Sequence, residues 1–432
     1  MHIRIYNLNM TTKLLLLVVS ITAFTICTML HVTQIPNKIK HVTVFIHGTV
    51  LPGLALLNPY KTYNNTLSSG DWYTQGLESV RNNPLLYQDG IILQKGLQYI
   101  SPTLLQAYKY KQLPSAYSTL GAYQAIGAYN VLASYLNIYN QQEADFYTYG
   151  FLGLLSDKHR QDVALMLYKE LVTLKNKYAQ EGYEASFTLI GYSHGGNVIL
   201  YLGSAEAQEQ KKLILNTIVL LATPLYKHAI KDIDYLHTSH IINCYSDGDA
   251  IQQTESISTP DSTSYKSLQA VLSPENNSTH KLLDIRVSAD TNTEAFGHCD
   301  FWYFNRYDNY YLWQDTKTQA IIDCINPLPL AILVPGFIML EHSLRSQQAG
   351  KYSSNVDIAL SFEDNKYILK AFDSTAKTCI AQTPDLSPAL CHIQNYALET
   401  WQPNAHASKT LKAGLGLWAA LKGSLSYLPF NQ

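Results

Sequence analysis

The sequence predicts an α/β protein built around a doubly wound, mostly parallel β-sheet. Short apolar, β-branched runs alternate with helical stretches along the chain, and most of these runs end in polar turns. A serine flanked by glycines stands where one such run passes into a helical stretch. Strands that alternate with helices favour a parallel sheet covered on both faces, and such sheets bind ligands at the carboxyl ends of their strands.

The predicted strands are continuous apolar runs of the kind found buried in parallel sheets. They cover residues 41–48, 144–151, 186–190, 216–224, 239–249 and 281–287. Ser156 is placed to cap a helix whose apolar residues share one face, namely Val163, Leu167, Leu171 and Leu174. The main domain is expected to span residues 41–320, and because 432 residues exceed the usual domain size, a large insertion and a small extension are expected as well.

The insertion is predicted at about residues 50–143, where the alternation of strands and helices breaks down. A part of it rich in Tyr, Ala and Leu could form a helix with one apolar face, at Leu120, Tyr123, Ile126 and Val131. Two interpretations stay open. The insertion is either a helical cap over an apolar substrate site or a helical decoration packed as ordinary core.

The final part of the chain, residues 325–432, changes in character. Two strand-like runs around the turn EDNK predict a β-hairpin at 356–372. This part is either a small accessory module or an extension of the cap. Its tail, KTLKAGLGLWAALKGSLSYLPF, either lies on a membrane surface or packs as a helix on its own domain.

Residues 1–33 have the pattern of a signal peptide or a signal anchor. Arg4 and Lys13 precede an uncharged apolar run from residue 14 to 30, which is at the lower limit of what can span a bilayer. We therefore expect a secreted or membrane-anchored protein that faces an extracytoplasmic compartment. In an oxidising compartment Cys379 and Cys391 could close a small disulfide loop around TPDLSP.

The charge and the cysteine spacing narrow the choice of partner. The chain has 31 basic and 33 acidic residues, for a net charge of −2, which gives no electrostatic reason to expect a nucleic acid. No Cys/His spacing suggests zinc, and neither a metal nor another cofactor is implied. A neutral or apolar substrate is favoured.

The serine motif is Gly191-Tyr192-Ser193-His194-Gly195, which matches G-x-S-x-G. This spacing is steric in origin, because a serine in a strained turn between strand and helix needs residues without side chains two positions before and two positions after it for the turn to close. Here a predicted strand precedes the motif and a predicted helix follows it. The backbone N–H groups at the helix start could also stabilise a developing oxyanion.

The motifs FIHG, IGYSHGG, LLATP and YSDGDAI together resemble the lipase and esterase members of the α/β-hydrolase superfamily, over roughly residues 41–310. The resemblance implies an α/β-hydrolase fold carrying the cap insertion. It also implies that Thr49, in the loop after Gly48, and His194 supply the oxyanion N–H groups. The ring of His47 would shape this loop rather than carry protons.

The resemblance further implies a catalytic triad in the order Ser, acid, His. Ser193 is the nucleophile. Asp249 is the favoured acid because a small and an aliphatic residue follow it, and Asp247 is the alternative. His298, after the last predicted strand, is the favoured base, and His280 is the poorer candidate because it precedes that strand.

The expected activity is hydrolysis of a carboxylic ester, best fitted to lipid-like substrates at a membrane surface, through an acyl-enzyme without a cofactor. A thioesterase or amidase would use the same residues. A different class of function is also open, namely a catalytically inactive, membrane-associated binding protein on a hydrolase scaffold. Reaction of Ser193 with an active-site phosphonate would distinguish the two classes.

Overall fold

The computed structural model of the protein describes residues 38–48, 96–101, 121–151, 157–230, 233–249, 252, 265–268, 270–271, 281–288, 296–302, 329–347 and 355–400. The predicted signal segment, much of the predicted insertion, the capping Ser156 and the C-terminal tail lie outside these residues. Within the described parts of the chain, no helix combines the length and the apolar character needed to cross a bilayer.

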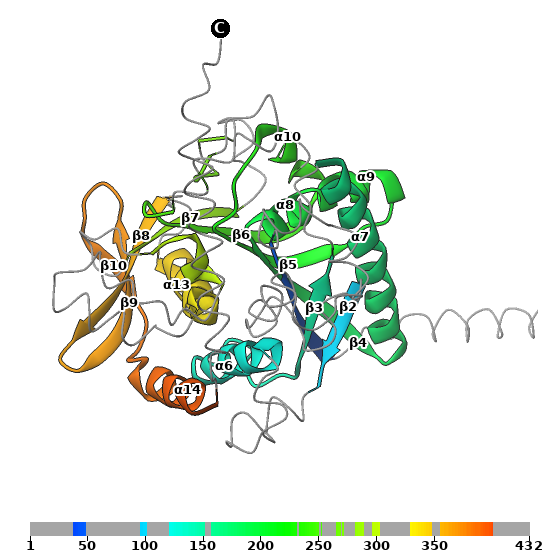
Figure 1. Ribbon diagram of the computed structural model, residues 1–432. Coiled ribbons are helices and arrows are strands. Elements are labelled where there is room, and N and C mark those ends of the chain that lie inside the picture. The colour runs from blue at the N-terminus through cyan, green and yellow to red at the C-terminus, as the bar shows by residue number, and fades with distance from the viewer. Residues whose placement is uncertain are drawn as a thin grey trace, which may run out of the picture.

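One ten-stranded sheet organises the described residues, in the order β10-β9-β8-β7-β6-β5-β4-β1-β3-β2 (Figure 1). All neighbours from β3 to β8 pair in parallel, whereas β2 at one edge and β9 and β10 at the other are antiparallel. The strands are β1 (Lys38–Ile46), β2 (Gly96–Ile100), β3 (Ala144–Gly150), β4 (Tyr183–Tyr192), β5 (Ile214–Leu221), β6 (His237–Tyr245), β7 (Lys281–Ser288), β8 (Asn355–Glu363), β9 (Lys366–Asp373) and β10 (Cys379–Gln382). Each strand predicted from the apolar runs is observed.

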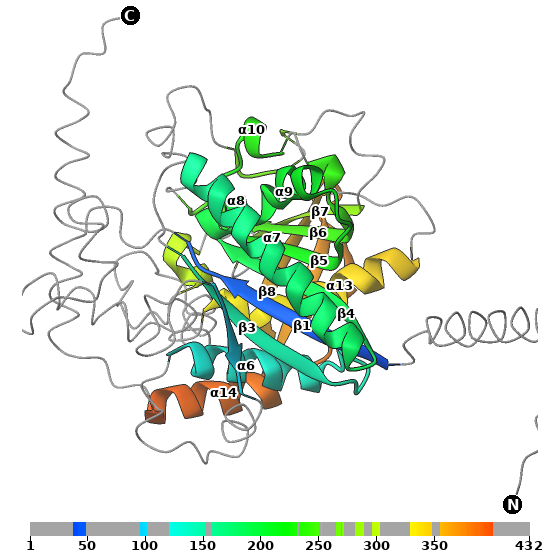
Figure 2. The ribbon, with the colours of Figure 1, turned by 90° about the vertical axis from the view of Figure 1, so that its right-hand side faces the viewer.

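Helices cover both faces of this sheet, so the α/β class and the doubly wound arrangement are confirmed (Figures 1 and 2). One face carries α7 (Asp157–Gln180), α8 (His194–Leu200), α9 (Leu202–Glu209) and α10 (Lys227–Ile230). The other carries α6 (Gly121–Tyr135), η6 (Leu330–Leu333), α13 (Val334–Gln347) and α14 (Ser387–Thr400).

The apolar side chains of a strand are divided between the two faces of the sheet, because successive side chains point in opposite directions. In β1, Val42 and Val44 point to the α7 face and Phe45 to the α13 face. The apolar face predicted for the helix after residue 156 is buried in α7, at Val163, Leu167, Leu171 and Leu174. Burial of each such side chain contributes about 1.5–3 kcal/mol.

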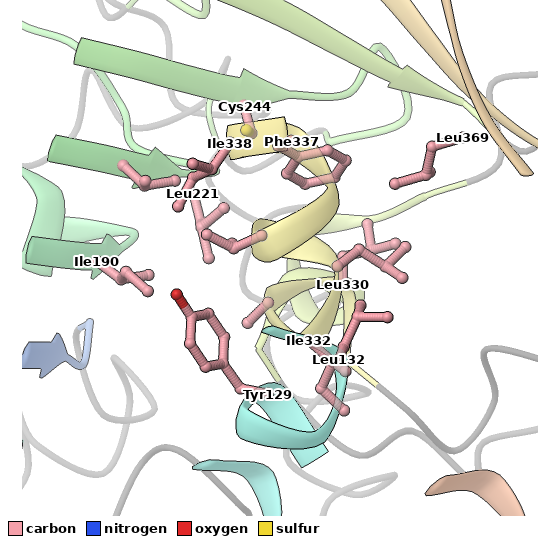
Figure 3. Packing of buried hydrophobic residues seen from close by; sticks show 14 of the residues in the cluster. Tyr129, Leu132, Ile190, Leu221, Cys244, Leu330, Ile332, Phe337, Ile338 and Leu369 are labelled. Carbon is pink, nitrogen blue, oxygen red and sulfur yellow. The ribbon is translucent and has the colours of Figure 1, made fainter. Parts of the chain in front are cut away.

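The α6 helix from the predicted insertion belongs to the core of the α13 face rather than to a lid. Ile126 and Leu132 are fully buried, and Val131 packs against the same cluster. Figure 3 shows side chains from the sheet, from α6 and from α13 meeting in one volume, including Ile190, Leu221, Cys244, Tyr129, Leu132, Phe337 and Ile338. The insertion also supplies β2, an edge strand of the sheet. The rest of the predicted cap lies outside the described residues.

The C-terminal part extends the same sheet instead of forming a separate module. The predicted hairpin is present as β8 and β9, and β8 pairs in parallel with β7 after the chain passes through α13. The apolar residues of α13 and α14 complete the α13 face. The module alternative is therefore wrong for residues 329–400.

The disulfide that Cys379 and Cys391 could form in an oxidising compartment is not present in the structure, in which both are exposed free thiols. Cys379 lies in the edge strand β10 and its thiol donates to the carbonyl of Ala381. Cys391 lies on α14. The two cysteines are close in sequence, but the segment between them leads from the strand β10 into the helix α14.

Candidate active site

Ser193 occupies a strained turn between β4 and α8. Its backbone has φ 52° and ψ −127°, a conformation that costs a non-glycine residue on the order of 1–3 kcal/mol. The turn is held on both sides, because Ser193 N–H donates to Leu221 O at 2.8 Å and Gly196 N–H donates to Ser193 O at 3.0 Å. The serine thus sits at the carboxyl end of a central strand, as the motif predicted.

The glycines around Ser193 allow backbone to approach backbone. A Cβ on Gly191 would lie 2.7 Å from the backbone of Gly196, and one on Gly48 would lie 2.6 Å from Ser193 Cβ. A Cβ on Gly195 would collide with the carbonyls of Ile46 and His47. The end of β1 therefore packs directly against the serine turn. Gly196 is equally constrained, by Thr223; sequence reasoning did not single it out, although the doubled glycine of SHGG was the available signal.

Ser193, His298 and Asp249 form one continuous hydrogen-bonded chain. Ser193 Oγ lies 3.0 Å from His298 Nε2, and His298 Nδ1 lies 2.8 Å from Asp249 Oδ2. A carboxylate can only accept, so Nδ1 carries the proton and Nε2 accepts from the serine hydroxyl. Ser193 and Asp249 are buried, and Asp249 Oδ1 accepts from Gln252 N–H at 3.1 Å.

His298 is fixed by aromatic packing as well as by the carboxylate. It opens η5 (His298–Phe301), after β7. The ring of Tyr192 stacks on Trp302 with centroids 5.1 Å apart and lies 5.0 Å from the ring of His298. Tyr192 Oη donates to His298 O at 3.2 Å. Sequence reasoning missed both aromatic residues, although Tyr192 lies inside the serine motif.

Asp247, the alternative acid, has another partner. Its carboxylate binds Arg286 Nη1 at 2.8 Å, and the guanidinium also binds Asp357 on β8 at 2.9 Å. The two carboxylates raise the pKa of Arg286, with the hydrogen bond to Asp357 the largest cause. Lys266 Nζ donates to the carbonyls of Ser246 and Asp247. Asp247 therefore anchors the turn after β6, while Asp249 alone of the pair contacts His298.

Of the two residues predicted to bind the oxyanion, the structure describes one. His194 is the first residue of α8, directly after Ser193, while Thr49 lies outside the described residues. The ring of His47 stacks on Phe151 with centroids 4.5 Å apart and accepts from Phe151 N–H at Nε2. Its Nδ1 then donates to Gly48 O at 2.7 Å. Burial lowers the pKa of His47 to about 4, so the ring is neutral at pH 7 and braces the loop.

The other predicted features fall outside the site. His280, the poorer base candidate, lies outside the described residues. Among the side chains that the structure describes, no group of three or more His, Cys, Asp and Glu residues could hold a metal ion. The site residues all follow the carboxyl ends of parallel strands, namely β1, β4, β6 and β7.

Comparison of the chain with models of known protein families, with curated proteins and with solved structures found no match. The fold and the site define the protein as an α/β protein with a Ser–His–Asp hydrogen-bonded chain at the carboxyl edge of its sheet. In this arrangement His298 can take the serine proton while Asp249 stabilises the charged ring.

Proposed function

We propose that this protein is a serine hydrolase of the α/β-hydrolase fold that cleaves carboxylic esters through an acyl-enzyme on Ser193. The observation that carries the proposal is the hydrogen-bonded chain from Ser193 through His298 to the buried Asp249. The strained turn that presents Ser193 supports it, because a non-glycine residue keeps such a backbone only where the surrounding structure enforces it.

The reaction would begin when His298 Nε2 takes the hydroxyl proton and Ser193 Oγ attacks the ester carbonyl. The negative oxygen of the tetrahedral intermediate would accept a hydrogen bond from the backbone N–H of His194. His298 would then pass its proton to the departing alcohol. A water molecule, activated by the same ring, would release the acid and restore Ser193.

The proposed substrates are lipid-like esters, met at or near a membrane on an extracytoplasmic side. This part of the proposal rests on the sequence, namely the apolar run at residues 14–30 and the small net charge of −2. The small net charge gives no electrostatic reason to expect a strongly charged substrate. Thioesters and amides present the same carbonyl chemistry and belong in the substrate screen.

The deciding experiment is labelling of the full chain, in mild detergent, with a fluorophosphonate. We expect wild type to label and Ser193→Ala and His298→Ala to fail. Matched controls are Ser343→Ala and His342→Ala on α13, on the opposite face of the sheet from α8, and both should label at the wild-type rate. Esters of graded acyl length, with one thioester and one amide, would then define the substrate.

Failure of folded wild type to label would overturn the hydrolase proposal. The binding-scaffold function would then take its place, and lipid binding without turnover would be the property to measure. Labelling that survives Ser193→Ala would place the reactive group elsewhere in the chain and overturn the assignment of the nucleophile.

A further inference from the structure

A buried arginine lies behind the serine turn. Arg160, in the first turn of α7, has no exposed surface. Moving a guanidinium out of water costs roughly several kcal/mol of solvation free energy, which interactions with its protein partners must offset. The other buried side chains of this helix are all apolar or tyrosine, so a buried charge is unusual here.

The guanidinium joins two elements that flank the serine. Its Nη2 pairs with Asp157 on the same helix, and its Nη1 donates to His194 Nδ1 at 3.1 Å. Its Cζ lies 5.9 Å from the ring centroid of Tyr226. Asp157 is in turn 2.7 Å from His228 Nε2, on α10. Burial alone would raise the pKa of Asp157, but Arg160 and His228 hold it below its usual value, so the carboxylate is charged at neutral pH.

This contact fixes the ring of His194. A guanidinium can only donate, so His194 Nδ1 must accept and the ring carries its proton on Nε2. The ring also stacks on Tyr226, with centroids 6.4 Å apart and planes 10° apart. Asn197 Nδ2 lies 3.4 Å from the same His194 nitrogen and donates to Pro224 O at 3.0 Å. The side chain next to Ser193 is thus held from three directions.

Stability alone does not account for Arg160. Within the described residues its Nε is buried and has no hydrogen-bond partner, which costs about 1–3 kcal/mol. A buried ion pair is often no more stable than apolar side chains of the same volume. The residue that accepts from Arg160 Nη1 is His194, whose backbone N–H adjoins the nucleophile.

We propose that Arg160 is a positioning residue for the oxyanion side of the site. By holding the ring of His194, it holds the first peptide of α8 so that its N–H faces the position where the negative oxygen of the tetrahedral intermediate would lie. The inference rests on the proposed hydrolase function and adds to it a residue that touches neither substrate nor nucleophile. Its effect should appear in the chemical step rather than in substrate binding.

The test compares Arg160→Met, Arg160→Lys and a control, Leu171→Ala, in the full chain in mild detergent. Leu171 is fully buried on the same helix, about 16 Å along it from Arg160. We measure the fluorophosphonate labelling rate, kcat and KM on p-nitrophenyl butyrate, and the melting temperature. Arg160→Met should lower the labelling rate and kcat by about 10- to 100-fold and leave KM within about twofold. Arg160→Lys should recover part of the loss.

The control separates positioning from folding. Leu171→Ala should lower the melting temperature and leave the labelling rate of the folded protein unchanged. If Arg160→Met does not fold, His194→Phe removes the same hydrogen bond from the other side and should give the same loss of kcat. Where both variants fold, the double variant should lose no more than either single one, because one interaction is removed.

The outcomes are distinguishable from failure of the proposed function. Wild type that does not label overturns the hydrolase and this inference together. Wild type that labels, with Arg160→Met labelling equally fast per folded molecule, leaves the hydrolase standing and overturns the inference. A change in KM alone would also overturn it, because it would place Arg160 in substrate binding.

Discussion

The two sides of Ser193 are built from different parts of the chain. On the side of the proposed base (the base side), His298 and Asp249 reach the serine from turns after β7 and β6, and His298 lies 105 residues away in sequence. On the side where we propose that the oxyanion binds (the oxyanion side), His194 is the next residue, and its ring is held by Arg160 of α7. The base side therefore depends on long-range packing of loops. The oxyanion side depends on the local turn and one buried charge.

The largest expected effect is on the base side, where two aspartates share one turn. Asp249→Asn should lower kcat by about 10³–10⁴-fold, because an amide can leave His298 in the wrong tautomer. Asp247→Asn should change kcat by less than about fivefold, since Asp247 pairs with Arg286. Steady-state kinetics on one ester, with melting curves for both variants, measures the contrast. Equal losses would show that the turn matters as a whole and Asp249 has no special role.

The next effect concerns the glycines that let β1 and α8 approach. Gly191→Ala should lower the free energy of unfolding by about 3 kcal/mol, because the new Cβ meets backbone that cannot move aside. Gly182→Ala is the control: nothing lies within 4 Å of its Cβ, but its φ is +82°, so about 1 kcal/mol is expected. Urea unfolding measures both. If Gly191→Ala lowered the free energy of unfolding by no more than Gly182→Ala does, the serine turn would not be closely packed.

The pH dependence tests the loop after β1. Burial lowers the pKa of His47 to about 4, whereas the unfolded chain has a pKa of about 6.5. Between these values the unfolded state binds more protons, so stability is present above pH 6.5 and is lost as pH falls toward 4. His47 should contribute about 2 kcal/mol to the loss between pH 7 and pH 5. Urea unfolding of wild type and His47→Gln at both pH values should show a shallower loss in the variant; parallel losses would contradict this.

The smallest effect is expected at the aromatic support of His298. Tyr192→Phe keeps the ring that stacks on Trp302 but removes the hydrogen bond to His298 O. Such a bond contributes about 1 kcal/mol, so kcat should fall by a factor of roughly 2 to 5. Kinetics and melting curves would check this. A loss as large as that of Asp249→Asn would make the hydroxyl a participant in the reaction rather than a support.

The sequence predicted the parts of the fold that local chemistry determines. Strands in the sheet centre are continuous apolar runs because both faces are covered, and α7 shows its buried face at helical spacing. The serine turn could be predicted from the sequence because the turn closes only with glycines at these positions. The pairing of Ser193 with His298 and Asp249 needed the resemblance to a known family, since nothing local joins residues from three separate loops.

The remaining features depend on long-range packing. Strand β8 pairs with β7 after the chain has passed through α13, and β2 joins the edge of the sheet from within an irregular insertion. The composition of these segments does not indicate which strand either of them pairs with. Arg160 was equally hidden, because an arginine in the first turn of a helix ordinarily lies in solvent, and its burial against His194 appears only when α7 and α8 are placed together.

The position of α6 has a consequence for the order in which the chain can fold as it is made. This helix contacts η6, α13 and α14, all of which are synthesised long after it. Until residues 329–393 emerge, the apolar residues on this face of the sheet lack the side chains of η6, α13 and α14 that share their cluster, and exposed apolar surface favours aggregation. A chain that ended before residue 329 would contain Ser193, Asp249 and His298 but would lack η6, α13 and α14 on this face of the sheet, so residues 329–393 act as a folding partner for the rest of the protein.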